Sequence, residues 1–176
     1  MYVYQAIRRT KENPVIEGTR IVREVLYEDI QTEAEILDKL EARICGIPGI
    51  WRIYRSVNRR NPVLAKLELI ETLTKQLVTP EAVSNKNPES LWKDILMQPK
   101  NKASRLFLVD IDTKDYTVCN AVINSVGAEV VVHKVVSTPN GYHVVCDPFN
   151  PERISNIANV SIKKDALLFI SLLEIE

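Results

Sequence analysis

Two carboxylates at the end of an apolar run are the residues best placed to do chemistry in this sequence. Asp110 and Asp112 follow the run 106–109 and are separated by one residue. Residues i and i+2 of a strand point to the same face of its sheet, so both side chains should project together. Converging carboxylates repel each other unless a cation such as Mg²⁺ or Mn²⁺ lies between them. The pair therefore predicts a divalent metal site, although an aspartate at a strand end is also a common helix cap.

A histidine delivered by a polar turn is the second candidate. His143 follows the segment 137–141, which lies between two β-branched runs. Hydroxyls and free backbone N–H groups in such a turn suit phosphate oxygens. The candidate phosphate ligands of the turn are Ser137, Thr138 and Asn140. The same Pro-Asn-Gly sequence is also a good hairpin turn that needs no chemistry. The other histidine, His133, is expected to pack or to lie at the surface.

A cluster of arginines in the first half is the third candidate. Four arginines fall within nine residues, interleaved with Trp51 and Tyr54. They are Arg52, Arg55, Arg59 and Arg60. Guanidinium groups bind phosphates through paired hydrogen bonds, and aromatic rings can stack on a base. The cluster therefore predicts contacts with a nucleotide or a nucleic-acid backbone, and the alternative is an edge strand blunted by charge.

A third acid, Asp165, stands just before the last apolar run. A third carboxylate often completes a site for two metal ions. On local sequence alone, a role in opening a turn is equally compatible with this position. The metal hypothesis therefore involves Asp110, Asp112 and Asp165 together.

The elements that must position these residues follow from periodicity and from capping signals. In the first half we expect strands over 2–10, 20–27 and 50–60 and helices over 32–44, 61–78 and 88–97. In the second half we expect strands over 106–111, 129–136 and 142–146, helices over 113–126 and 151–159, and extended stretches over 160–162 and 166–173. The second half then reads βαββαβ, which is the order of a ferredoxin-like or RRM-like sandwich.

This order predicts an α+β protein with two parts that form one compact unit. Residues 105–176 are expected to be RRM-like, and residues 1–104 are expected to be a strand/helix extension packed on them. In this topology the first and third strands form the central antiparallel pair. Asp110, at the end of the first of these strands, and His143, at the start of the third, should therefore meet.

Composition limits the partners that the chain can have. Its 176 residues carry no formal net charge, so nucleic acid can bind only through a local patch. No run of eighteen apolar residues occurs, and the first residues lack the order of a signal peptide. The three cysteines are widely spaced, as expected of free, buried thiols rather than a zinc site. We therefore expect a cytoplasmic protein with no membrane partner.

Together, these features resemble the three motifs of the archaeo-eukaryotic primase superfamily. The matching elements are Asp110-x-Asp112, the turn 137–143 with its histidine, and Asp165. The resemblance covers about residues 105–175, and the catalytic palm of that family is RRM-like. It therefore implies an RRM-like palm in the C-terminal half of this chain.

The same resemblance implies a metal-dependent nucleotidyltransferase of DNA replication or repair. Asp110, Asp112 and Asp165 would hold Mg²⁺ or Mn²⁺, and His143 with Ser137 or Thr138 would contact the phosphates of a nucleoside triphosphate. Single-stranded or primed nucleic acid would bind through the basic patch, and a replication protein could act as partner. The chain is shorter than most members and shows no zinc site. It would then be a reduced version from a phage or mobile element, or an inactive nucleotide-binding descendant.

Two other classes of protein stay open. The motif Asp110-Ile111-Asp112-Thr113 is also typical of three-carboxylate exonucleases and of aspartate phosphatases. These enzymes normally need a larger α/β sheet with further acids downstream. The other class is a non-catalytic RRM-like module that binds single-stranded nucleic acid or a protein. Metal dependence separates the classes, because an enzyme should lose activity but not folding when Asp110 and Asp112 become alanine.

Overall fold

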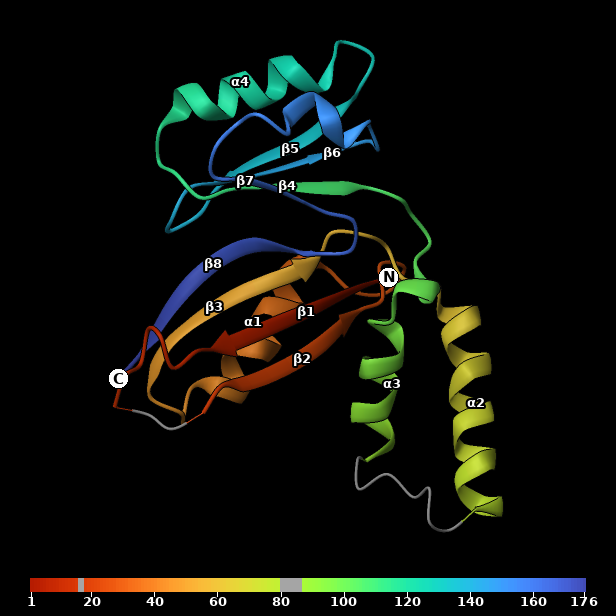
Figure 1. Ribbon diagram of the computed structural model, residues 1–176. Coiled ribbons are helices and arrows are strands. Elements are labelled where there is room, and N and C mark those ends of the chain that lie inside the picture. The colour runs from red at the N-terminus through yellow and green to blue at the C-terminus, as the bar shows by residue number, and fades with distance from the viewer. Residues whose placement is uncertain (16–17, 80–86) are drawn as a thin grey trace.

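The computed structural model describes residues 1–15, 18–79 and 87–176, and the α+β class is confirmed in them (Figure 1). The strands of a first sheet are β1 (Tyr2–Arg8), β2 (Arg20–Leu26), β3 (Gly49–Ser56) and β8 (Leu167–Ile175). Those of a second sheet are β4 (Phe107–Ile111), β5 (Val132–Ser137), β6 (Tyr142–Cys146) and β7 (Val160–Lys163). The first sheet has the order β2-β1-β3-β8 and the second the order β5-β6-β4-β7. All the strand pairs are antiparallel.

The helices begin where the sequence places capping residues. The α-helices in the described residues are α1 (Glu33–Ile44), α2 (Pro62–Val78), α3 (Pro88–Leu96) and α4 (Tyr116–Val126). Two short 3-10 helices are η2 (Pro99–Asn101) and η3 (Pro151–Ile154). The side chains that accept N-terminal backbone N–H groups are those of Thr32, Asn61, Asn87 and Asp115. These caps satisfy donors that the first turn of a helix leaves without partners.

Each sheet has one helix on its outer face, so the two sheets face each other (Figure 1). On the first sheet, Ile36 and Leu40 of α1 pack in one buried cluster with Trp51 and Ile53 of β3. On the second sheet, α4 forms a separate cluster with alternate residues of β4 and β6. A small third cluster joins the sheets through Val57, Leu108, Val145 and Leu168.

The helices α2 and α3 form an appendage beside the first sheet (Figure 1). Ala65 of α2 and Ile95 and Leu96 of α3 are buried with Val3 of β1 and Val25 of β2. This contact fixes α3 against the sheet, and α2 lies beside α3 on its outer side. The appendage therefore has its own small core, apart from the space between the sheets.

The structure differs from the sequence-based expectation at three places. The helix expected over 151–159 is only the short η3, because the chain continues through turns over 155–159 before β7 begins. The last extended stretch pairs with β3 and so belongs to the first sheet, although it follows the second sheet in the chain. Cys119 and Cys146 are buried and free as expected, but Cys45 is exposed because it caps the end of α1.

Candidate functional site

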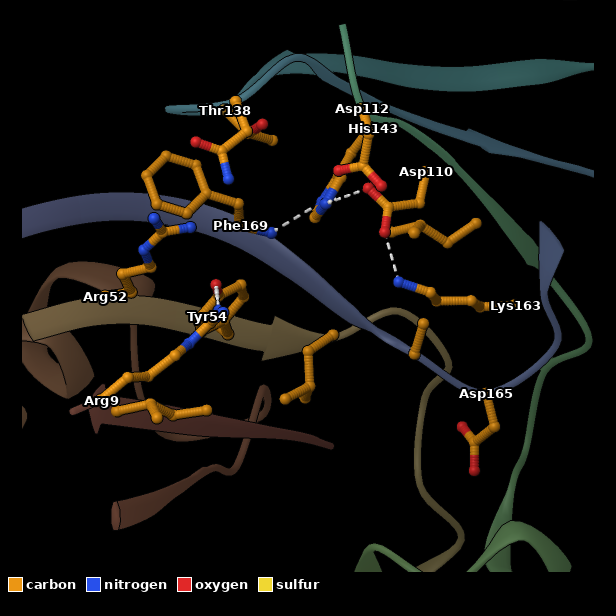
Figure 2. Close-up of a pocket in the computed structure, with 15 residues that line it drawn as sticks. Arg9, Arg52, Tyr54, Asp110, Asp112, Thr138, His143, Lys163, Asp165 and Phe169 are labelled. Carbon is orange, nitrogen blue, oxygen red and sulfur yellow. Dashed lines mark hydrogen bonds and ion pairs between the residues drawn. The ribbon is translucent and has the colours of Figure 1, made fainter. Parts of the chain in front are cut away.

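A cavity of about 400 Å³ lies between the two sheets and brings residues from both halves of the chain together. The polar residues that line it are Arg9, Arg52, Tyr54, Asp110, Asp112, Thr138, Asn140, His143, Lys163 and Asp165. Figure 2 shows that Asp110, Asp112 and His143 come from one side of this cleft and Arg9 and Arg52 from the other. Most of the candidates chosen by sequence therefore share one site.

The alternation of β4 explains why its acids face the cleft. Val109 and Ile111 are fully buried beneath α4, so the residues that alternate with them along the strand must point to the opposite face. That face carries Leu108, which joins the two sheets, and then Asp110 and Asp112. Asp110 and Asp112 therefore both project from the end of β4 into the cleft, as predicted.

Asp110 and His143 meet directly across the sheet, as the expected strand order required. They are cross-strand partners in the pairing of β4 with β6. Nε2 of His143 lies 3.3 Å from Oδ1 of Asp110. The backbone N–H of Phe169 in β8 donates a hydrogen bond of 3.1 Å to Nδ1 of the same ring. Nδ1 is therefore an acceptor, and in the neutral ring the proton lies on Nε2 and faces the carboxylate.

A cation completes the surroundings of Asp110. The Lys163 ammonium at the end of β7 forms an ion pair with Oδ2 of this carboxylate. The hydrogen bond from His143 and then the bond and charge of Lys163 lower the pKa of Asp110 to about 2, against the opposing effect of burial. The side chain of Asp110 is only 16% exposed, so this charge is largely shielded from water.

The turn between β5 and β6 lies over the end of β4 because a glycine allows it. A Cβ atom on Gly141 would lie 1.9 Å from the carbonyl oxygen of Ile111, a distance that no side chain tolerates. The hydroxyl of Thr138 accepts a hydrogen bond of 3.0 Å from the Gly141 N–H. Thr138 and Asn140 consequently line the cleft next to Asp112, which is exposed.

The opposite wall presents two arginines that are held by their neighbours. Arg52 of β3 forms an ion pair of 2.8 Å with Glu12, and its side chain is 11% exposed. Arg9, which directly follows β1, donates to the hydroxyl of Tyr54 and lies 5.7 Å from the centre of that ring. Tyr54 in turn packs edge-to-face against Phe169 at 5.8 Å. Both cations are therefore positioned at the cleft by contacts that do not use up all their N–H donors.

Five sequence-predicted residues have surroundings different from those expected. Arg55 lies over the ring of Tyr2 at 4.6 Å, and Arg59 pairs with Glu28 at the surface. Ser137 is exposed and does not line the cleft. Arg60 is fully buried and forms a two-pronged ion pair with Asp165 at 2.7 and 3.2 Å. Of the four clustered arginines, only Arg52 lines the cleft.

Of the three candidate acids, only two are placed to share a divalent ion. Within the described ranges, no group of three His, Cys, Asp or Glu side chains is arranged to hold a metal. Asp165 lines the cleft, but its carboxylate is held by Arg60. Asp110 and Asp112 alone provide the arrangement in which Mg²⁺ typically binds, with one or two carboxylates and the remaining ligands from water or phosphate. A metal that arrives with a phosphate ligand fits this site, and a metal cage built from protein side chains does not.

Sequence reasoning missed Arg9 and Lys163. Lys163 is one of two lysines that directly precede Asp165, and Arg9 is the second residue of a basic pair at the end of the first strand. A signal for Lys163 existed in the alternation of β7, since Val160 and Ile162 pack beneath α4 and Lys163 must face the other way. Nothing local to Arg9 indicates its role, which depends on the pairing of β1 with β3.

No protein-family model matches this sequence, and no match is found among curated proteins. None of the helices in the described residues is both long and apolar enough to cross a bilayer. The interpretation of the site therefore depends on its geometry and on the resemblance of its motifs.

Proposed function

We propose that the cleft binds a nucleoside triphosphate and transfers its nucleotidyl group to a hydroxyl with release of pyrophosphate, as a small primase-type enzyme would. The observation that carries this proposal is the opposition of Asp110, Asp112 and His143 on one wall to Arg9 and Arg52 on the other. A triphosphate needs cations along its oxygens, and the reacting phosphate needs acids that can share a divalent ion with it. The proposal thus uses both walls of the same cleft.

The order of the second sheet supports the RRM-like palm within this proposal. Numbered within residues 105–176, the order β5-β6-β4-β7 reads 2-3-1-4, which is the order of a ferredoxin-like sheet. The site then lies at the end of the central strand pair, β4 and β6. The second helix of that topology corresponds to the short η3.

Each residue has a distinct role in the proposed reaction. Arg9 and Arg52 bind phosphate oxygens through guanidinium N–H groups, and Thr138 and Asn140 offer neutral donors opposite them. His143 orients Asp110 through Nε2–H, because its other nitrogen is fixed by the Phe169 N–H. Asp110 and Asp112 are the groups that would hold Mg²⁺ or Mn²⁺. The bound ion would supply charge neutralisation at the triphosphate and activation of the attacking hydroxyl.

Metal-dependent nucleotide binding tests the proposal. Binding of a fluorescent nucleoside triphosphate is measured with and without Mn²⁺ for the wild type and for the double variant Asp110→Asn/Asp112→Asn. We expect the folded double variant to lose the Mn²⁺-dependent part of the binding by at least about tenfold, since each lost carboxylate removes one metal ligand. A wild-type protein that binds no nucleoside triphosphate with either metal would overturn the proposal.

Matched controls separate the site from general charge effects. Asp115→Asn removes a carboxylate outside the cleft and keeps a residue type that caps α4 well. Arg59→Gln removes an arginine that pairs with Glu28 at the surface, for comparison with Arg52→Gln in the cleft. Only the cleft variants should weaken binding. Binding that survives in the cleft variants would place the nucleotide elsewhere. Primer extension is assayed only if the cleft variants lose binding.

One observation favours a second candidate, which is nucleotide binding without catalysis. Lys163 already neutralises Asp110 and so takes the position of a cation at the carboxylate. In a non-catalytic descendant this ammonium would contact phosphate directly, and binding would need no metal. Equal affinity with EDTA and with Mn²⁺, together with loss of binding in Lys163→Gln, would select this candidate over the enzyme.

A further inference from the structure

Helix α2 exposes a row of large apolar side chains that the proposed cleft does not use. Leu77 is 85% exposed, Leu67 is 61% exposed and Ile70 is 53% exposed. The other exposed apolar residues of the helix are Val63, Leu64 and Val78. Single exposed apolar residues are common, but six on one helix form a patch of the kind that marks an interaction surface.

The spacing of this row identifies the kind of partner. Val63, Leu67, Ile70, Thr74 and Leu77 follow one another at intervals of four, three, four and three residues. A 4-3 alternation averages 3.5 residues and corresponds to the a and d positions of a coiled coil. It favours another α-helix, laid nearly parallel to the axis of α2, over a strand or a flat surface.

The row faces away from the other parts of the chain that the structure describes. Ala65 is the buried residue of α2 and packs in a cluster with Ile95 and Leu96 of α3. Ala65 lies about 200° around the helix from both Val63 and Leu67, because each residue advances by about 100°. Figure 1 shows α2 on the outer side of α3, away from both sheets. A partner helix can therefore approach the row without displacing α3.

Charges beside the row indicate which helix this partner is. With Leu67 and Thr74 at a, Lys66 is at a g position and Glu71 is at the following e position. In a parallel, in-register pair of identical helices, each g residue lies next to the e residue five positions later on the other helix. Lys66 of each copy would therefore lie next to Glu71 of the other, and the twofold symmetry makes this pair twice.

We propose that α2 pairs with α2 of a second copy of this chain as a short parallel coiled coil. In the single chain, Glu71 forms an exposed i,i+4 ion pair with Lys75, which contributes little to stability. Glu71 can therefore exchange Lys75 for Lys66 of the second copy. The helix is 17 residues long, so it presents about two heptads. Its attachment to α3 holds it in the binding conformation, which reduces the entropy cost of association.

Sedimentation equilibrium over a range of protein concentrations tests the pairing. The wild type should show a reversible monomer–dimer equilibrium, and Ile70→Glu should be monomeric with an unchanged circular dichroism spectrum. Lys75→Gln lies on the same helix outside the row and should dimerise like the wild type. A wild type that stays monomeric up to its solubility limit would overturn the proposal and leave the row to a different partner. A dimer that persists in Ile70→Glu would overturn it too, because the contact would lie elsewhere.

The charge pattern and the orientation are tested separately. Lys66→Glu should weaken the dimer by placing two acids together, and Lys66→Glu/Glu71→Lys should restore it. For orientation, Thr74→Cys is made in a Cys45→Ser background, since Cys45 is the exposed cysteine. In a parallel pair the two Thr74 positions face each other, so oxidation should give a disulfide-linked dimer. Failure of the double charge variant to recover, or a dimer without the disulfide, would contradict the parallel register.

Discussion

Two ion pairs flank the bend between β7 and β8, and they have opposite characters. Lys163, at the end of β7, reaches Asp110 in the cleft with a side chain that is 50% exposed. Asp165, two residues later, binds Arg60 through both oxygens, and the Arg60 side chain has no exposure at all. In the first pair, Lys163 can leave Asp110 and bind a ligand, because water and solutes reach its ammonium. The other has no access to solvent on its arginine side.

This difference teaches that chemistry and spacing alone do not reveal which acid of a motif can act. Asp110 and Asp165 both lie at the edge of one cavity and both have a cationic partner. The planar fork of Arg60 matches the carboxylate of Asp165 and also reaches the carbonyl oxygen of Met97 at 3.4 Å. Asp165 therefore stabilises the junction of the two sheets. The carboxylate of Asp110 is instead paired with Lys163, whose ammonium lies on a flexible, half-exposed side chain.

The largest expected effect comes from breaking the buried pair. Asp165→Asn leaves the guanidinium of Arg60 buried without a counter-charge, which should lower the free energy of unfolding by about 3–5 kcal/mol. Urea denaturation at neutral pH measures this loss. Arg60→Leu with Asp165→Asn removes both charges and should recover part of it. A loss below about 1 kcal/mol in the single variant would place this pair with surface pairs.

A smaller and pH-dependent effect is expected at the cleft. The pKa of Asp110 is about 2 in the folded protein, against an ordinary value of 3.8, so the folded state binds fewer protons than the unfolded state between these values. The ion pair with Lys163 and the hydrogen bond from His143 therefore stabilise the protein fully above about pH 4, and this stabilisation is lost as the pH falls toward 2. Asp110→Asn should cost about 2 kcal/mol at pH 7 and progressively less below pH 4, as measured by denaturation at each pH. A cost independent of pH would mean that packing, and not charge, is responsible.

The smallest effect on stability is expected for the exposed cations. Lys163→Gln and Arg59→Gln each remove an exposed cation from an ion pair, so each should cost less than about 1 kcal/mol. The two variants should differ in ligand binding, because only Lys163 lines the cleft. Titration with inorganic triphosphate in EDTA should show weaker binding for Lys163→Gln alone. Equal binding by both variants would mean that Lys163 does not leave Asp110 to contact a ligand.

The sequence predicted well what depends on local periodicity. The βαββαβ order, assigned from periodicity and caps, placed Asp110 and His143 on neighbouring strands, and the structure has them as direct partners. The helix starts followed from Thr32, Asn61 and Asn87, since capping is a local interaction.

What could not be predicted depends on contacts between distant segments. Arg60 and Asp165 are 105 positions apart, and each looked free to bind a ligand when only its neighbours were considered. The cluster of four arginines divides because successive side chains of β3 point to opposite faces and the chain then turns into α2. Only the pairing of β1 with β3 brings Arg9 to Tyr54.

The path of β8 has a consequence for how the protein folds. This strand leaves the second sheet and pairs along β3, so residues more than a hundred positions apart close the first sheet. Such non-local pairing slows folding, because loop-closure entropy is lost before the contacts that reward it form. During synthesis the first sheet must wait with β3 unpaired on one side until residues 167–175 have left the ribosome. The cleft, which takes Phe169 from β8, can therefore form only after β8 has joined β3.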